Sequence, residues 1–292
     1  MKLRDLSYLV AVAKTLHFGK AAAMVHVSQP TLSVQIKKLE DRLGIVLIER
    51  NNKNVRLTPA GHIIAEKATR ILQDIEAIKI YAHTMKDPLA GDIHLGIIPT
   101  LGPYLMPQLV QTMHQKLPKI SLWLHEQKTH TLVEQLQQGQ LDLAIVALPI
   151  NDESLTTIPL FTEDFYFAVN NAHPLANKKS IGFKEINEEK ILLLADGHCM
   201  RDQTLRVCEN IQTLFMSDFQ ATSLETLRHM VAQNLGTTLI PKLATQTNTP
   251  HVKYLPFKKP VPCRELGLVF RKTHVRAELF SQMAKVAVSL AP

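Results

Sequence analysis

The chain has 292 residues, of which 46% are hydrophobic and 20% are charged. This length accommodates a small module together with one or two globular domains. No apolar run approaches the roughly 20 residues that a membrane-spanning helix needs, and the N-terminus lacks the hydrophobic core of a signal peptide. We therefore expect a cytoplasmic protein with no membrane partner, whose three cysteines form no structural disulfide framework.

The formal net charge of +7 is concentrated in the first third of the chain. Residues 1–87 contain 14 Lys and Arg against 8 Asp and Glu, whereas residues 88–292 contain 19 against 18. A basic module attached to a nearly neutral body indicates a polyanionic partner, most often nucleic acid. A basic surface that only maintains solubility is the alternative, and charge alone does not choose between the two.

The spacing of apolar residues predicts three short helices at the start of the chain. They cover residues 3–15, residues 20–25 and the segment from Ser28 to Gly44, with a break at His17 to Gly19. Ser28 is expected to cap the third helix, because serine is a favoured N-cap residue. The buried stripe of the third helix is expected to consist of Leu32, Ile36, Leu39 and Leu43.

Three short helices with a tight second turn are typical of a helix-turn-helix DNA reader. The side of the third helix away from its buried stripe carries Pro30, Thr31, Val34, Lys37 and Lys38. Its small polar residues lie at the N-terminal end, which meets base edges in the major groove, and its lysines follow where phosphates would lie. A generic three-helix bundle is the alternative interpretation.

The segment that follows predicts a wing and a long helix. Residues 45–57 contain Arg50, Lys53 and Arg56, which suits a basic β-hairpin beside the reading helix, although a solvated loop is the alternative. Thr58 is expected to cap a helix that runs to about Lys86. An apolar seam of alternating four- and three-residue spacing predicts a dimer, with packing on the chain's own body as the alternative. Its members are Ile64, Ala68, Ile71, Ile75, Ile78, Ala82 and Met85.

The body of the chain alternates between strand and helix patterns after a hinge at residues 87–92. The strand patterns cover residues 93–98, 120–125, 141–147 and 237–240, and the helix patterns cover residues 105–116 and 131–138. Thr222 and Glu225 are expected to form a capping box that opens a further helix, which ends before Gly236. This rhythm predicts an α/β body with a mostly parallel sheet and helices on both faces.

Cys199 and Cys208 lie nine positions apart in the middle of the body. If the segment is an unbroken helix, their Cα atoms lie roughly 13 Å apart, whereas a disulfide needs a Cα separation below about 7 Å. A bond between them would therefore require the segment to refold, which would make the pair a switch. Two inert thiols are the alternative.

The neighbours of Cys199 do not make a reactive site by themselves. His198 and Arg201 favour a thiolate, whereas Asp196 and Asp202 oppose it, so further donors are expected from elsewhere in the fold. The 13 histidines are scattered and match no recognised ligand spacing. We predict no bound metal and no cofactor.

The first third of the chain resembles the LysR-type transcriptional regulators. The resemblance is carried by Phe18 to Ala22, Val27 to Ser33, Ile36 to Glu40 and Leu57 to Gly61. It implies a winged helix-turn-helix over residues 1–58, a dimerising linker helix over residues 59–87 and a regulatory domain over residues 88–292. The residues that it assigns to contact with double-stranded DNA are Gln29, Pro30, Thr31, Ser33 and Lys37.

The same resemblance implies two α/β lobes similar to periplasmic binding proteins. Lobe I would comprise about residues 88–163 and 267–292, and lobe II, inserted into it, about residues 164–266. The assembly would be a homodimer or homotetramer that recruits RNA polymerase.

A second set of residues is similar to the hydrogen peroxide sensors within that family. It comprises Gly197 to Gln203 with Cys208, and residues 98–105, 124–130 and 221–228. The resemblance implies that peroxide attacks Cys199 and that Cys208 resolves the product as an intramolecular disulfide. Thr100, Thr129, His198 and Arg264 would form the peroxide pocket, and thiol reductants of the glutaredoxin or thioredoxin type would reset the switch.

Three positions differ from the peroxide sensors of the family. Asp218 stands where these sensors can carry histidine, and Arg206 replaces a smaller or aromatic residue, so both bear on how readily the segment refolds. Cys263 is extra, and we expect it to be uninvolved, with a mixed disulfide to Cys199 as the minor alternative. Two rival functions remain. One is a regulator that responds to a small-molecule inducer, and the other is a thiol peroxidase; we expect a regulator and not an enzyme.

Overall fold

The structure is a computed structural model that describes residues 1–292 except 52–53, 85–88 and 209–213. The chain divides into two compact units, Met1–Lys86 and Asp87–Pro292. No helix within the described residues is long and apolar enough to cross a bilayer.

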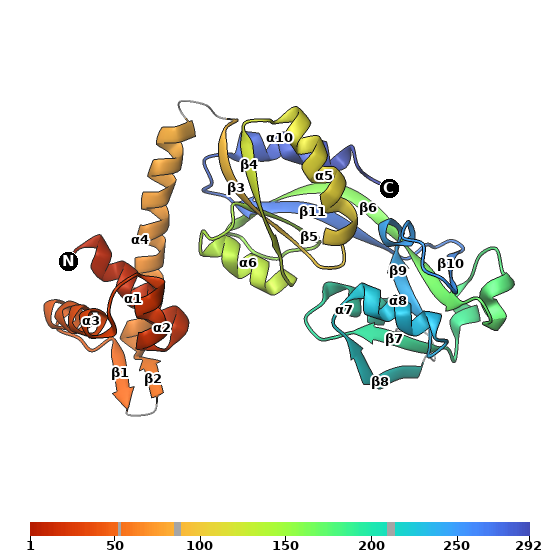
Figure 1. Cartoon of the computed structure of the whole chain (residues 1–292), viewed down its shortest axis with the longest axis horizontal. Helices are drawn as coiled ribbons and strands as arrows, with labels where there is room; N and C mark the ends of the chain where they lie inside the picture. The colour runs from red at the N-terminus through yellow and green to blue at the C-terminus, as the bar shows by residue number, and fades with distance from the viewer. Residues whose placement is uncertain (52–53, 85–88, 209–213) are drawn as a thin grey trace. The chain divides into compact units, whose positions relative to one another are not determined.

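The first unit contains the three predicted helices, the hairpin and the long helix (Figure 1). Its elements are α1 (Leu3–Thr15), α2 (Phe18–Met24), α3 (Gln29–Leu43), β1 (Ile48–Asn51), β2 (Asn54–Leu57) and α4 (Pro59–Thr84). Leu32, Ile36 and Leu39 are fully buried, as the apolar stripe predicts. The antiparallel pairing of β1 with β2 confirms the hairpin and rules out the solvated loop.

Side-chain caps fix where these helices begin. The Ser28 hydroxyl accepts a hydrogen bond from the Thr31 backbone N–H at 3.3 Å, which confirms the predicted cap. The predicted break between the first two helices is confirmed at His17, but it does not extend to Phe18 and Gly19, which belong to α2. His17 Nδ1 accepts hydrogen bonds from the backbone N–H groups of Gly19 and Lys20, at 3.1 and 3.2 Å. His17 therefore caps α2, which begins two residues earlier than predicted.

The apolar seam of α4 is partly covered by the unit itself. Ala68 is 1% exposed and packs against α1, as the alternative interpretation expects. Ile71 and Ile78, further along, are 40% and 67% exposed. The seam is thus buried at Ala68 within one chain and exposed at Ile71 and Ile78, whereas Met85 lies outside the described residues, and the predicted dimer stays a prediction.

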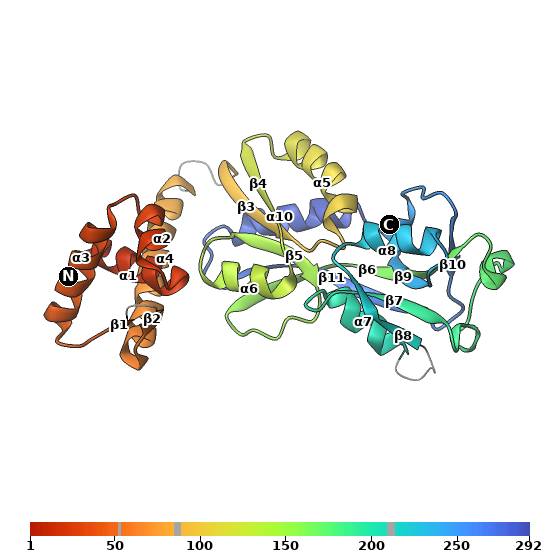
Figure 2. The ribbon, with the colours of Figure 1, turned by 60° about the horizontal axis from the view of Figure 1, so that its bottom comes forward.

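The second unit holds the remaining strands and α-helices, together with two 3₁₀ helices at Pro174–Asn177 and Phe183–Ile186 (Figure 2). The strands and α-helices follow in chain order. They are β3 (Gly91–Ile97), α5 (Gly102–Lys116), β4 (Ile120–Glu126), α6 (Thr129–Gln137), β5 (Leu143–Ala147), β6 (Leu155–Asn170), β7 (Lys190–Leu194), α7 (Cys199–Cys208), β8 (Leu214–Ala221), α8 (Leu224–Ala232), β9 (Thr238–Pro241), α9 (Lys242–Thr245), β10 (Val252–Pro256), β11 (Cys263–Arg271) and α10 (Ala277–Val288).

The main sheet is mixed, so the prediction of a mostly parallel sheet is wrong. Its strand order is β10-β6-β11-β5-β3-β4, with β9 also paired to β6. β3 is parallel to β4 and β5, but β11 runs antiparallel to both β5 and β6. The long strands β6 and β11 were not predicted, and β11 runs against both of its neighbours in the centre of the sheet.

Two hydrophobic cores lie along these long strands. Leu160 of β6 belongs to the core around β3, β5 and α10. Phe165, five residues later on the same strand, belongs to the core around β7, α8 and β9. Because β6 and β11 are paired along this stretch, the chain crosses between the two cores twice on adjacent strands.

The predicted start and end of α8 are both displaced. Ser223, rather than Thr222, caps the helix, and its hydroxyl accepts a hydrogen bond from the Thr226 backbone N–H at 3.2 Å. The left-handed residue after the helix is Asn234, with φ 57°, rather than Gly236. Glu225 is thereby released from the predicted capping box.

Candidate redox and DNA-binding sites

Cys199 and Cys208 occupy the first and last positions of one helix, α7. This confirms the helical interpretation of the segment, so the Cα atoms lie about 13 Å apart. All three cysteines of the chain are thiols in this structure. Cys199 is half-buried and Cys208 is 2% exposed. The structure is therefore that of the reduced form, in which the helix keeps the two sulfurs apart.

Opposing influences act on the Cys199 thiol. Burial raises its pKa, and Asp202 adds to that effect, as predicted. The charge of Arg264, the Thr129 hydroxyl and the Met200 backbone N–H lower the pKa, but burial outweighs them. The pKa of Cys199 consequently lies above its usual range, and at neutral pH the group is a thiol that has donors in place for its anion.

Arg264 is the cation beside this thiol, and it is held rigidly. Its side chain is fully buried and forms an ion pair with Glu163, whose side chain is also fully buried, at 2.7 Å. Its Nη1 donates to the Thr100 hydroxyl at 2.8 Å, and its Nη2 donates to the Thr100 carbonyl at 3.1 Å. Glu163 also accepts a hydrogen bond from the Leu243 backbone N–H at 2.7 Å. The network joins β6, β11, α9 and the segment before α5.

Two buried oxygen atoms near Cys199 have no hydrogen-bond partner at ordinary geometry within the described part of the chain. They are Thr129 Oγ1 and Gln203 Oε1. Gln203 is 6% exposed and lies one helical turn after Cys199, on the same side of α7. An unpaired buried acceptor costs about 1–3 kcal/mol, and a small molecule that donates hydrogen bonds would relieve that cost.

The charged residues next to Cys199 in the sequence have different partners in the structure. Arg201 Nε pairs with Asp196 at 2.9 Å, and its Nη1 donates to the Leu194 carbonyl at 3.0 Å. The expectation that Arg201 favours the thiolate is therefore not supported, because its charge is committed to Asp196. His198 is 5% exposed, and burial, together with the charge of Lys128, lowers its pKa.

The four residues predicted for a peroxide pocket are not equally placed. Thr129 and Arg264 act directly on the Cys199 thiol, and Thr100 is bonded to Arg264. His198 precedes Cys199 and is buried beside it. Glu163 and Gln203 were missed. A signal was available for Gln203, which is four residues after Cys199, whereas Glu163 stands between Thr162 and Asp164 and had none.

A second polar cluster connects the two cores of the second unit. The Tyr104 hydroxyl, at the start of α5, donates to Glu225 of α8 at 2.8 Å. The guanidinium of Arg228, which is wholly buried, lies over the Tyr104 ring at 5.3 Å from its centroid. Tyr104 packs against both cores. Glu225, predicted as a capping residue, thus links the cores instead.

The residues predicted to contact DNA lie on α3. Gln29, Pro30, Thr31 and Lys37 are exposed, and Ser33 is half-buried. The Thr31 hydroxyl lies 2.7 Å from the Ser28 hydroxyl, so it is also part of the helix cap. The arrangement agrees with a helix that presents a polar N-terminal end and a lysine further along.

The three departures have distinct surroundings. Cys263 is exposed, and side chains alternate along a strand, so it points away from the buried Arg264 and from the Cys199 site. This geometry argues against a mixed disulfide. Arg206 is exposed on α7. The side chain of Asp218 lies outside the described residues. Among the described side chains, no group of three or more His, Cys, Asp or Glu is placed to hold a metal ion.

Comparison with known proteins gives consistent matches over both units. The model "Bacterial regulatory helix-turn-helix protein, lysR family" matches residues 3–62, and the model "LysR substrate binding domain" matches residues 86–289. The "DNA-binding transcriptional dual regulator OxyR" of Escherichia coli strain K12 is 43% identical over 98% of this chain and 94% of its own length.

Solved structures agree with the sequence match. A full-length OxyR variant from Pseudomonas aeruginosa has a TM-score of 0.79 and 39% identity, and covers 98% of this chain and 94% of its own. A crystal structure of the oxidised form of OxyR has a TM-score of 0.63 and 40% identity, over 70% of this chain and 97% of its own. The chain belongs to the LysR family of bacterial helix-turn-helix regulators.

Proposed function

We propose that this chain is a DNA-binding transcription regulator that responds to hydrogen peroxide through Cys199 and Cys208. The observation that supports this most directly is the placement of the two thiols at opposite ends of one helix, with the first beside Arg264 and Thr129. One relative is named as a DNA-binding transcriptional dual regulator, OxyR, and another as a hydrogen peroxide-inducible genes activator, which supports the proposal. As a family member it is a regulator and not an enzyme.

The chemistry has two steps that balance. The Cys199 thiolate attacks one oxygen of hydrogen peroxide, the O–O bond breaks, and the released hydroxide takes a proton to become water, leaving a sulfenic acid. Cys208 sulfur then attacks the Cys199 sulfur, and the sulfenic oxygen leaves as a second water once Cys208 has lost its proton. Thr129 and Gln203 would accept hydrogen bonds from peroxide, and Arg264 would stabilise the thiolate. Thr100 would fix Arg264, and His198 would line the pocket.

The second step forces a change of structure, because α7 must unwind before the two sulfurs can meet. Cys208 would also leave the core in which it is buried. Thiol reductants of the glutaredoxin or thioredoxin type would reverse the bond. The refolded segment would alter the contacts between subunits of a homodimer or homotetramer, and so change how α3 meets double-stranded DNA and how the complex recruits RNA polymerase. Because DNA and RNA polymerase would be its partners, the protein would act in the cytoplasm.

Intact-mass measurement after mild peroxide tests the assignment. The wild-type chain should lose two hydrogens and yield a peptide that links Cys199 to Cys208. Cys208→Ser should stop at a single added oxygen, whereas Cys199→Ser should show neither change. Cys263→Ser is the matched control and should form the link as the wild type does. A link between Cys199 and Cys208 that does not alter the operator footprint would contradict the regulatory proposal.

A further inference from the structure

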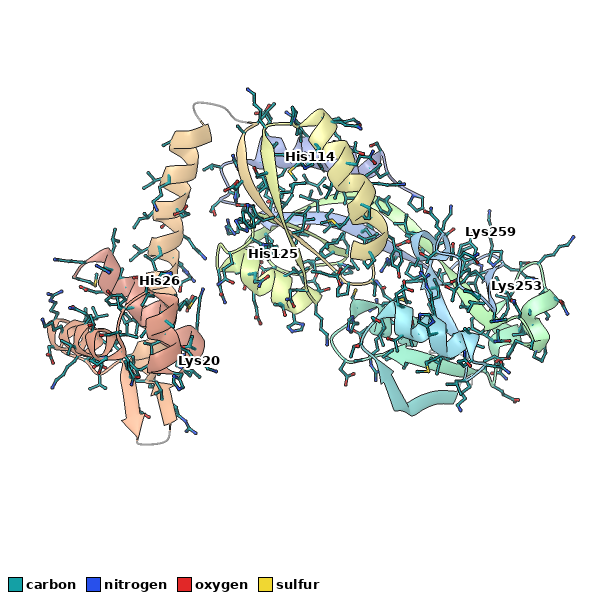
Figure 3. The ribbon with its side chains drawn as sticks, viewed as in Figure 1. Lys20, His26, His114, His125, Lys253 and Lys259 are labelled. Atoms are coloured by element: carbon teal, nitrogen blue, oxygen red, sulfur yellow. The ribbon has the colours of Figure 1, made fainter. Side chains whose placement is uncertain are left out.

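Two histidine rings contact each other at the open edge of the main sheet, outside the cysteine site. His94 Nδ1 on β3 and His125 Nε2 on β4 form a hydrogen bond of 3.1 Å, in which one ring nitrogen donates its proton and the other accepts it, and the ring centroids lie 5.4 Å apart. β4 is the terminal strand of the sheet order. Both histidines are half-buried and Trp123 beside them is 56% exposed, so solvent reaches the pair. Figure 3 labels His125 in this unit.

The separation of the two nitrogens suits a shared metal ion. Zinc is bound by imidazole nitrogen at about 2.0–2.1 Å, so two ligating nitrogens lie about 3.4 Å apart in a tetrahedral site and about 2.9 Å apart in a square-planar one. The observed 3.1 Å falls between these values. Imidazole is a preferred ligand of zinc(II), nickel(II) and copper(II).

The two rings are also held by rigid elements. β3 and β4 are paired in parallel register, with Gly96 opposite His125. The His94 backbone N–H donates to the Asp142 carboxylate at 2.7 Å, and Asp142 is itself 3.0 Å from His274. Metal binding would replace the proton between the two nitrogens and would turn both rings toward the ion, while the paired strands keep the two ligands at adjacent positions.

We propose that His94 and His125 form a two-imidazole binding site for a divalent transition-metal ion of the zinc, nickel and copper(II) class, with water in the remaining coordination positions. Because structural zinc sites have four protein ligands, a site with only two is exchangeable rather than structural. The site is independent of the cysteine chemistry. It did not emerge from the sequence because its members are 31 positions apart and meet only through strand pairing.

The chain contains a built-in reporter for this site. Trp123 is its only tryptophan, and its ring lies 5.9 Å from the His94 ring, nearly parallel to it. Nickel(II) chloride should quench the fluorescence of the full-length chain with half-saturation at micromolar concentration, with a non-chelating phosphine present to keep the thiols reduced. Zinc(II) should compete with nickel(II) and restore the signal.

Variants separate the site from adventitious binding. His125→Gln should raise the half-saturating nickel(II) concentration at least tenfold, and His94→Gln should do the same. His229→Gln, at an exposed histidine of α8, is the matched control and should leave it unchanged, and thermal melting should show that all three variants are folded. Equal half-saturation in His125→Gln and wild type, or half-saturation in wild type only at millimolar nickel(II), would overturn the proposal.

Discussion

Glu163 and Arg264 are opposed residues on the antiparallel strands β6 and β11, and their fully buried side chains form an ion pair of 2.7 Å. The carboxylate offsets part of the positive charge that Arg264 presents to Cys199. Glu163 therefore acts against the thiolate while it holds in place the cation that favours it. The balance suits a thiol that is unreactive at rest and has its stabilising groups already positioned.

Neutralising Glu163 should expose this balance. In Glu163→Gln, Arg264 keeps its full charge, so the pKa of Cys199 should fall and its alkylation by iodoacetamide at pH 7 should become faster. Breaking a buried pair costs about 3–5 kcal/mol, so the free energy of unfolding in urea should decrease as well. The exposed neighbour Glu265 supplies the control: Glu265→Gln should change neither quantity. An unaltered alkylation rate in Glu163→Gln would show that Glu163 does not govern the thiol.

The raised pKa of Cys199 predicts a steep pH dependence of its oxidation. Because the thiolate is the reactive form and the usual pKa of a cysteine is about 8.5, the thiolate fraction should rise about tenfold per pH unit from pH 7 to pH 8.5. Stopped-flow measurement of peroxide consumption by Cys208→Ser, which isolates the first step, should follow this slope. A rate that is constant over this range would mean that the thiolate already dominates at pH 7.

Thr129 offers a test in which function and stability move separately. Its hydroxyl is buried and has no hydrogen-bond partner at ordinary geometry, although it lies near enough to Cys199 to favour the thiolate. Thr129→Val should therefore leave the free energy of unfolding unchanged or slightly increased. The same change should slow oxidation of Cys199 by peroxide at least tenfold, because a hydrogen-bonding partner of the thiol and of peroxide is lost. Thr112→Val on α5 serves as the control. An unchanged oxidation rate in Thr129→Val would exclude Thr129 from the pocket.

The buried histidines predict a loss of stability in mild acid. Burial lowers the pKa of His274, which is 7% exposed, although its hydrogen bond to Asp142 partly opposes this. Below about pH 6.5 the unfolded chain therefore binds a proton that the folded chain does not. Stability should fall as the pH drops from 7 to 5, by up to about 1.4 kcal/mol per pH unit for this group.

Urea unfolding at several pH values measures this dependence. His274→Gln should flatten the slope between pH 7 and pH 5, whereas His229→Gln, at an exposed position, should keep it. The comparison depends on slopes, so a general loss of stability in the variant does not obscure it. Identical slopes in His274→Gln and wild type would contradict the assignment.

The exposed Lys37 predicts that the affinity for DNA depends on the salt concentration. Lys37 is exposed on α3, where a phosphate contact is proposed, and each such contact adds about one unit to the slope of log affinity against log salt. Lys37→Ala should weaken operator binding and reduce that slope by about one unit per reading helix, as measured by fluorescence anisotropy. Lys79→Ala, whose lysine pairs with Glu76 at 3.0 Å, should keep the slope. Equal slopes in both variants would remove Lys37 from the interface.

The sequence predicts local structure well where a cap or an apolar period decides it. Ser28 and the Leu32–Ile36–Leu39 stripe specify α3 and its faces, whereas the sequence left open whether the segment from Cys199 to Cys208 is a helix, as it is in α7. The second helix was predicted to start two residues too late because the His17 ring nitrogen caps it, a function that a pattern of apolar residues does not reveal.

The site is harder to predict because its parts are distant in the chain. Cys199 is readable as a motif, but Arg264 acts on it from β11 and Glu163 from β6, and only strand pairing brings these residues together. The same holds for Tyr104 and Glu225, which are 121 residues apart. The family resemblance supplied Arg264, whereas nothing in the local sequence indicated that Glu163 would be its partner.

The pairing of β6 with β11 makes the second core an insertion whose two ends adjoin. Asp164 and Cys263 stand opposite each other across the strand pair, and nearly all residues of that core lie between them in the chain. The segment that carries α7 could therefore be excised or exchanged as a cassette between neighbouring attachment points, without rethreading the rest of the regulatory unit. The stretch carries Cys199 and Cys208, whereas Thr100, Thr129 and Arg264 stay behind on the rest of the unit, so a replacement stretch would have to match groups that are already fixed.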